Sequence, residues 1–176
     1  MSEKPLVQAA SANPDCPPVA AASTLAVTPL QVSSMAAVAR SRLLTVLPNS
    51  LLVEVAVLLS SSQINVVVVC DAAGSPLGTI TETVLVRRLG LGQADFFTTA
   101  ASEVMSRDFS ACAPEDLLPD VLAKMHAHGL IYVLVVDANH KVLGVVNARD
   151  GLRAMLTAGN YEEALLRNYV MGVGYQ

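Results

Sequence analysis

One stretch in the second half of the chain decides its fold, namely Val133-Leu134-Val135-Val136-Asp137-Ala138-Asn139-His140-Lys141-Val142-Leu143-Gly144-Val145-Val146-Asn147-Ala148-Arg149-Asp150. Its first apolar run, up to Val136, is typical of a strand buried on both faces. Turn-forming residues separate this run from a second one, so the stretch predicts a β-hairpin. Asn147 then precedes residues with helical spacing, where Asn is a good N-cap and Asp150 stands where the acid of a capping box would. A strand that leads into a helix N-terminus can hold an anion or a polar ligand.

The same pattern occurs earlier in the chain, at a constant offset of 66 residues. Residues 67–81 align with residues 133–147 without a gap, and Pro48 aligns with Pro114 in the same register. A gapless register of this length predicts two copies of one structural unit. A single unit of about 45 residues cannot bury enough apolar surface to fold alone. We therefore expect an α/β fold of the α+β type, with two β-α-β-β-α repeats packed in pseudo-twofold fashion.

The apolar spacing and the turn residues predict the elements of each copy. The first copy should contain a helical piece over residues 34–40, strands at 43–46, 66–70 and 77–80, a helix over 51–61 capped by Ser50, and a helix from Thr81 to Gly90. The second should contain helices over 98–106, 115–128 and 148–156 and strands at 109–113, 130–136 and 142–146. Residues 1–33 are predicted to be a mobile tail, 34–96 the first domain with a linker, 97–158 the second domain, and 159–176 an amphipathic C-terminal helix and tail.

Composition excludes several classes of function. Hydrophobic residues make up 53% of the 176, yet no apolar run approaches the ~18–20 residues of a membrane span. The net charge is −4 with no basic run, which argues against a nucleic-acid surface. The three cysteines, Cys16, Cys70 and Cys112, are odd in number and scattered, so we expect reduced thiols in a cytoplasmic protein. The N-terminus lacks a compact apolar core before a cleavage site, so we expect it to be a poor secretory signal.

Several motifs together resemble a tandem pair of cystathionine-β-synthase (CBS) domains, or Bateman module, of the stand-alone bacterial type. They are Val104-Met105-Ser106-Arg107-Asp108, Pro114, residues 133–137 and residues 144–150 in the second copy, and Pro48, residues 67–71 and residues 78–81 in the first. The resemblance covers about residues 34–158. It implies a dimeric regulatory module that needs no cofactor, binds AMP, ADP, ATP or another adenosyl compound, and signals to an unknown protein partner by a change of shape. In the family, the first helices, here 51–61 and 117–128, pack against the twin.

The family's ligand motif is Gly, two apolar residues, Thr or Ser, two residues, and Asp. The second copy matches at Gly144 and Asp150, with Asn147 in place of Thr or Ser. The first matches at Gly78 and Thr81, but Val84 stands where the Asp should be. A hydrocarbon side chain cannot accept a ribose hydroxyl hydrogen bond. We therefore expect only the Asp150 cleft to bind a nucleotide well.

The resemblance also implies which residues form that cleft: Leu44, Ile64, Asn65, Val145, Val146, Asn147, Arg149 and Asp150. Adenine would lie among Leu44, Ile64 and Val146, the ribose would bind Asp150, and phosphates would face the helix N-terminus and Arg149. Interpretations in which these residues bind no ligand remain open. Asp150 could be only a helix cap, and Arg149 only a solvated side chain.

Two classes of function therefore remain, a nucleotide sensor and a ligand-free scaffold that uses the CBS fold for dimerisation and docking. The sequence shows no nucleophile with an adjacent base, so we expect no catalytic residues and no enzyme activity. His126 and His128 lie two positions apart on a helix, point in different directions, and are poor joint metal ligands. We expect no metal site.

Overall fold

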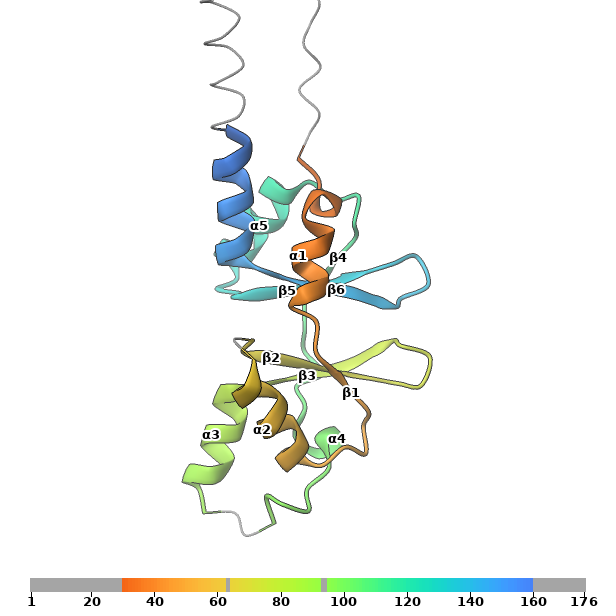
Figure 1. Cartoon of the computed structure of the whole chain (residues 1–176), viewed down its shortest axis with the longest axis vertical. Helices are drawn as coiled ribbons and strands as arrows, with labels where there is room; N and C mark the ends of the chain where they lie inside the picture. Colours follow the sequence, from red (N-terminus) through yellow and green to blue (C-terminus); the bar gives the residue numbers. More distant parts are fainter. Residues whose placement is uncertain (1–29, 63, 93–94, 160–176) are drawn as a thin grey trace, which may run out of the picture.

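The computed structural model describes residues 30–62, 64–92 and 95–159. It contains two three-stranded sheets, β1-β2-β3 and β4-β5-β6, which face each other, with helices on their outer sides (Figure 1). Most of the predicted N-terminal tail and the predicted C-terminal helix lie outside the described residues. Within the described residues, no helix is both long enough and apolar enough to span a bilayer.

Both repeats contain strand, helix, strand, strand and helix in that order, as predicted. The first consists of β1 (Thr45–Val46), α2 (Leu52–Ser61), β2 (Val66–Cys70), β3 (Pro76–Thr81) and α3 (Glu82–Gly90). The second consists of β4 (Ala111–Cys112), α5 (Leu118–Ala127), β5 (Tyr132–Val136), β6 (Val142–Asn147) and helical residues 148–159. The first strand of each repeat pairs in parallel with the second, which pairs antiparallel with the third. The predicted fold class is therefore confirmed.

The strand pairing follows the register of the sequence repeat. Val68 pairs with Thr79 in the first sheet, and Leu134 pairs with Val145, 66 positions later, in the second. Alternate strand residues point to opposite faces of a sheet. One set packs between the two sheets and consists of Val66, Val68, Cys70, Leu134 and Val145 with their neighbours. The other set, including Val67, Val69 and Ile80, packs under the helices. Because both faces are covered, the central strands β2 and β5 are almost wholly apolar.

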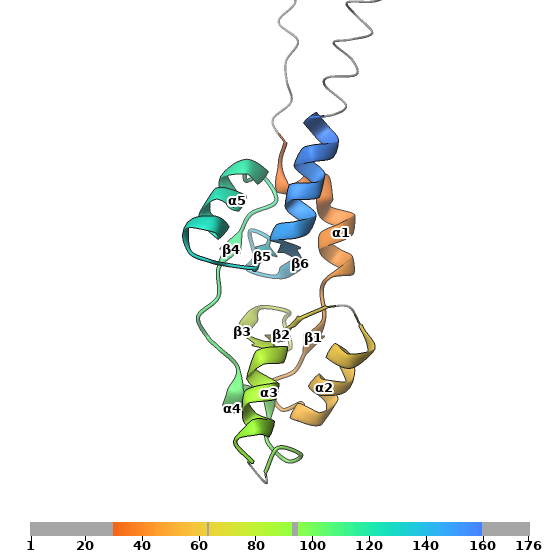
Figure 2. The same ribbon diagram turned by 90° about the vertical axis from the view of Figure 1, so that its left-hand side faces the viewer.

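Each repeat is covered by a short helix that comes from the other. The segment η1 (Val32–Met35) and α1 (Ala36–Ser41) precedes the first repeat in the chain, but it packs on the second sheet, where Ala39 joins the core around Val146. Conversely, α4 (Ala101–Val104) packs on the first sheet, and its Ala101 is fully buried there. Figure 2 shows α1 beside the residues 148–159 helix, and α4 lies with α2 and α3 on the outer side of the first sheet. The two repeats therefore exchange their opening helices.

A glycine in each sheet allows this exchange. A Cβ atom on Gly144 would lie 2.7 Å from the backbone carbon of Ala39, and one on Gly78 would lie 2.6 Å from the backbone oxygen of Ser106. Such distances are too short for any side chain, because the obstructing atoms belong to the backbone. In this structure, the two glycines that the resemblance assigns to a ligand motif therefore serve close packing of the exchanged segments.

Some element ends differ from the prediction. The N-cap of α2 is Leu51 rather than Ser50, and the N–H of Leu51 donates to the carboxylate of Glu54 at 3.1 Å. Thr81 stands at the N-cap of α3 as predicted, but its side chain makes no capping hydrogen bond. Pro119 lies in the first turn of α5, as expected, because that position needs no N–H donor. The first strand of each sheet, β1 and β4, is shorter than predicted, at two residues each.

Candidate ligand-binding cleft

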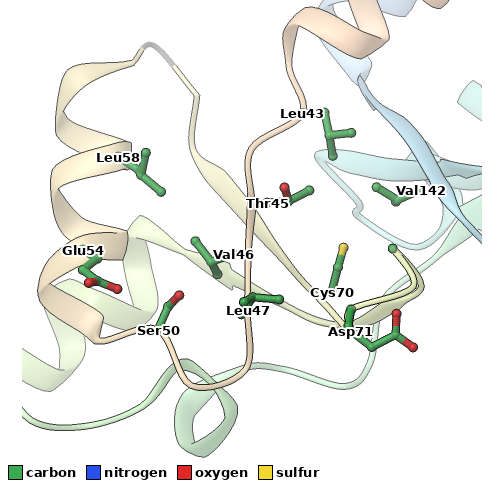
Figure 3. Close-up of a pocket in the computed structure, with 12 residues that line it drawn as sticks. Leu43, Thr45, Val46, Leu47, Ser50, Glu54, Leu58, Cys70, Asp71 and Val142 are labelled. Atoms are coloured by element: carbon green, nitrogen blue, oxygen red, sulfur yellow. The ribbon is translucent and has the colours of Figure 1, made fainter.

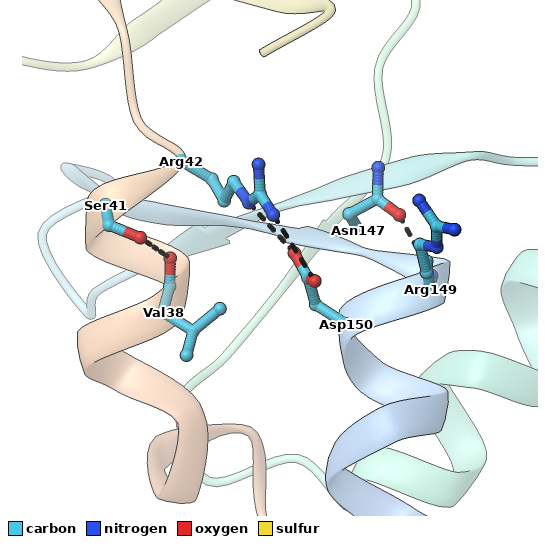
Figure 4. A network of polar contacts seen from close by, with 6 residues as sticks. All are labelled: Val38, Ser41, Arg42, Asn147, Arg149 and Asp150. Atoms are coloured by element: carbon cyan, nitrogen blue, oxygen red, sulfur yellow. Dashed lines mark hydrogen bonds and ion pairs between the residues drawn. The ribbon is translucent and has the colours of Figure 1, made fainter. Parts of the chain in front are cut away.

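The predicted site lies where β6 passes into the helical residues 148–159. Asn147 ends the strand, and its Oδ1 accepts a hydrogen bond from the N–H of Arg149 at 2.9 Å (Figure 4). This is the side-chain bond of an N-cap, and the predicted capping role of Asn147 is confirmed. The Asn147 side chain that caps this helix therefore lies at the predicted site.

The carboxylate of Asp150 binds a guanidinium that the sequence did not point to. Its Oδ2 lies 2.9 Å from Nε of Arg42, and its Oδ1 lies 3.4 Å from Nη2 of the same side chain. The Asp150 side chain is only 11% exposed, whereas the Arg42 side chain is 36% exposed. Arg42 is the C-cap residue of α1, so the helix exchange brings it to Asp150. The two residues are 108 positions apart, and no local pattern links them.

A small cavity of about 40 Å³ opens beside this ion pair. We call the cavity together with Asp150 the Asp150 cleft. Its lining comes from both repeats and consists of Arg42, Ile64, Asn65, Val66, Ile131, Tyr132, Val145 and Asn147. Ile64, Asn65, Val145 and Asn147 were among the predicted site residues, and the structure brings them together. The cavity holds about one water molecule, far less than the 300–1,000 Å³ of a typical small-molecule site.

Three of the predicted residues lie elsewhere. Leu44 packs against the core of the first repeat, and Val146 is fully buried in the core of the second. Val146 points to the helical side of its sheet because its neighbour Val145 points to the other side. Arg149 is exposed, and its backbone N–H binds Asn147. A ring in this cleft would therefore contact Ile64 and Val145 rather than the predicted set of Leu44, Ile64 and Val146.

The corresponding position of the first repeat offers no carboxylate. Val84 is half-buried and packs against the core of that repeat. In the same repeat, Thr79 at the centre of β3 binds across the repeats to Tyr132, a residue that also lines the Asp150 cleft. The two repeats therefore differ in the chemistry that they present to a ribose.

A larger cavity, of about 650 Å³, lies at the other end of β2, which begins at Val66 in the Asp150 cleft and ends here at Cys70 (Figure 3). Sequence reasoning did not find it. Its two acidic side chains already hold the local backbone. Glu54 accepts from the N–H of Leu51, and Asp71 accepts from the N–H groups of Ala73 and Ser75. No basic side chain lines this cavity among the residues described, so it lacks an obvious partner for a phosphate.

Neither of the two described cysteines has the lowered thiol pKa that a nucleophilic cysteine needs. Burial, with a smaller contribution from Asp71, raises the pKa of the Cys70 thiol. Burial and then the charge of Asp116 raise the pKa of the Cys112 thiol to about 11. Thiols with raised pKa values stay protonated at neutral pH and react slowly. In the part of the chain that the structure covers, no three His, Cys, Asp or Glu side chains are grouped to hold a metal ion.

Comparison with known proteins identifies the repeat. The family model for the CBS domain matches the chain twice, over residues 34–90 and 101–157. Among curated proteins, the chain is 24% identical over 137 residues to a protein of Acidianus ambivalens described as an uncharacterized 17.7 kDa protein in the bps2 3′ region. The match covers 78% of this chain and 82% of that one.

Solved structures with the same fold include two with bound adenosyl compounds. One is the CBS domain pair of protein MJ0100 in complex with 5′-methylthioadenosine and S-adenosyl-L-methionine, with a TM-score of 0.62, 23% identity, and coverage of 75% of this chain and 98% of that one. Another is CBSX2, a protein of Arabidopsis thaliana, in complex with AMP, with a TM-score of 0.61, 17% identity, and coverage of 73% and 97%. At these identities the likeness establishes the fold.

Proposed function

The chain belongs to the CBS domain family, and from this premise we propose that it is a regulatory module that binds an adenine nucleotide or a related adenosyl compound in the Asp150 cleft. The ligands named for MJ0100 and CBSX2 support this class of ligand. The proposed role is regulatory and not enzymatic, and we place the protein in the cytoplasm on account of its cysteine usage. No membrane or nucleic-acid partner is part of the proposal.

One observation carries the proposal, namely the convergence of three chemical groups from both repeats. Asp150 supplies a carboxylate that can accept two hydrogen bonds from a ribose diol. Arg42 and the helix that begins after Asn147 supply positive charge for a phosphate. Ile64 and Val145 supply apolar walls for a flat ring. We therefore expect the adenosyl group to lie between the two sheets.

A cavity of about 40 Å³ cannot hold a nucleotide as it stands. Binding therefore requires Arg42 and the cleft walls to move apart, and these walls belong to different repeats. A ligand that binds the open form more tightly shifts the population toward that form. This displacement of one repeat against the other is the signal that we propose a partner protein reads.

The proposed module is a homodimer. Large apolar side chains remain exposed on the outer helices, including Val57 on α2, Val86 and Leu89 on α3, and Leu152 and Leu156 in residues 148–159. Apolar surface gathered on such helices is typical of protein interfaces. These exposed side chains lie on α2, as the family resemblance implies, and also on α3 and residues 148–159. None of them lies on α5, so we propose that α2, α3 and the last described helix form the dimer interface.

The test is a thermal-shift screen of the full chain with AMP, ADP, ATP, NAD, 5′-methylthioadenosine and S-adenosylmethionine. A ligand at 100 times its Kd adds about 2.7 kcal/mol to the free energy of unfolding, which raises the melting temperature by about 5–10 °C for a chain of this size. Asp150→Ala should remove most of this shift. The matched control Glu115→Ala removes an exposed carboxylate outside the cleft and should keep it.

A ligand-free scaffold remains the second candidate, because the Arg42–Asp150 ion pair already satisfies the carboxylate that a ribose would need. If no adenosyl compound shifts the wild type at millimolar concentration while the protein remains a dimer, the scaffold function is favoured. If Asp150→Ala binds as tightly as the wild type, the ligand lies elsewhere, and the larger cavity beside Cys70 becomes the first place to map.

A further inference from the structure

The position of Arg42 is fixed by the backbone around it. Its N–H binds the carbonyl oxygens of Val38 and Ala39 at 3.2 and 3.3 Å, which ends α1 on the second sheet. The chain then crosses to the first sheet, where the carbonyl of Leu44 accepts from the N–H of Val68. Arg42 therefore stands at the crossover between the two repeats, and its side chain lies over Asp150 in the cleft (Figure 4).

The charges in the cleft are close to balanced. Asp150 is nearly buried, and a carboxylate removed from water needs a cation or several hydrogen bonds nearby. Of the residues described as lining the small cavity, Arg42 is the one with a formal charge. A ligand that takes the ribose position must share Asp150 with Arg42 or displace Arg42 from it.

A neutral ligand and an anionic ligand meet this requirement differently. A neutral nucleoside that displaces Arg42 replaces a charge-assisted contact with ordinary hydrogen bonds and leaves the guanidinium without its carboxylate. A ligand with a phosphate offers the guanidinium a second anion, so Arg42 can turn from Asp150 toward the phosphate while remaining paired. The ligand's own negative charge thus compensates for opening the ion pair.

Resting on the function proposed above, we infer that Arg42 makes the Asp150 cleft selective for anionic adenosyl ligands. A nucleotide such as AMP binds, and an uncharged adenosyl compound such as 5′-methylthioadenosine is rejected. Arg42 is a specificity-determining residue in this scheme, and the Arg42–Asp150 pair is the gate that the phosphate opens.

The experiment measures the affinity of the full chain for AMP and for 5′-methylthioadenosine by isothermal titration calorimetry. The wild type should bind AMP at least tenfold more tightly than the uncharged compound. Arg42→Gln should weaken AMP at least tenfold and strengthen 5′-methylthioadenosine, since Asp150 is then open to the ribose. Arg42→Lys keeps the charge and should keep the preference for AMP, although the fork geometry is lost.

Arg40→Gln is the matched control. It makes the same charge change two residues earlier, on an exposed side chain of α1 that lines a different cavity with Val32 and Leu143. Its two affinities should equal those of the wild type. Equal wild-type affinities for the two ligands, or an AMP preference that survives Arg42→Gln, would overturn the inference.

The same titrations separate this inference from the proposed function. If the wild type binds neither compound and no other ligand of the thermal-shift screen, the proposed function fails. The Arg42→Gln variant then decides the role of the arginine. If the variant gains 5′-methylthioadenosine binding, Arg42 is the residue that excludes neutral ligands, and if it still binds neither compound, the inference fails as well. Circular dichroism melting curves establish that every variant is folded before its affinities are compared.

Discussion

The hydroxyl of Tyr132 lies 3.2 Å from Oγ1 of Thr79, and this hydrogen bond joins β5 of the second repeat to β3 of the first. Thr79 is 1% exposed, so its hydroxyl has little access to water. The backbone of Thr79 also exchanges two hydrogen bonds with Ser106, at 2.8 and 2.9 Å. One residue of the first sheet is therefore tied both to the opposite sheet and to the segment that follows α4.

Removing the hydroxyl with Tyr132→Phe should lower the free energy of unfolding by about 1–3 kcal/mol, because the Thr79 hydroxyl would stay buried without this partner. Urea denaturation measures the change. The double variant Tyr132→Phe/Thr79→Val removes both partners and should cost less than the sum of the two single changes. If Tyr132→Phe unfolds at the same urea concentration as the wild type, the bond contributes nothing to holding the repeats together.

Gly144→Ala should destabilise the protein by about 1–3 kcal/mol, because its Cβ would collide with the backbone of Ala39 and push α1 away from β6. Equilibrium unfolding in urea measures this loss. Gly90→Ala is the control, since a Cβ on Gly90, the last residue of α3, would meet nothing within 4 Å. Ala favours helix over Gly, so this control should be neutral or slightly stabilising. A Gly144→Ala variant as stable as the Gly90→Ala variant would mean that α1 can shift without cost.

The proposed homodimer should have a mass near twice 18.4 kDa in light scattering at tens of micromolar. Leu152 and Leu156 are 55% and 69% exposed and lie one helical turn apart, so they share a face. Leu152→Lys/Leu156→Lys should convert the dimer to a monomer with little change in secondary structure. Val38→Lys, on the exposed side of α1, should remain a dimer. A wild type that scatters as a monomer would remove the dimer from the proposal.

Stability should fall in alkaline solution in part because of Cys112. Its thiol has a pKa of about 11 in the folded protein, raised from 9.0 mainly by burial. Between these two values the unfolded chain releases the proton more readily than the folded one, so the free energy of unfolding decreases as pH rises from about 9 to about 11. The total loss should be at most about 2–3 kcal/mol. Urea titrations should show the free energy of unfolding of the wild type falling relative to that of Cys112→Ala between pH 8 and pH 11. Parallel curves would contradict the assignment to Cys112.

The features that the sequence predicted correctly depend on residues that are close together in the chain. The valine runs before Asp71 and Asp137 specify two buried strands, and Asn147 specifies the helix start after β6, because hairpins and caps are set by neighbouring residues. The alternation of strand residues could also have removed Val146 from the site, since Val145 and Val146 cannot both face the gap between the sheets. That signal was present in the sequence and was missed.

The features that could not be predicted depend on contacts between distant residues. Arg42 is an ordinary basic residue after a short helix, and only the exchange of α1 onto the second sheet brings it to Asp150. The sequence contains one sign of the exchange, namely a glycine at equivalent positions of the two repeats, Gly78 and Gly144. The family resemblance placed them in a ligand motif, whereas the structure shows that each admits a segment from the other repeat.

The exchanged helices also set the order in which the chain can fold during its synthesis. The helical layer on the first sheet is incomplete until α4 joins α2 and α3, and α1 cannot dock until β6 appears, about 100 residues after it. Contacts this distant in sequence close large loops and slow the formation of the native state. We therefore expect that neither repeat folds by itself. If synthesis stops between the repeats, the released chain exposes α1 and the apolar face of the first sheet, and such partly folded chains are bound by chaperones.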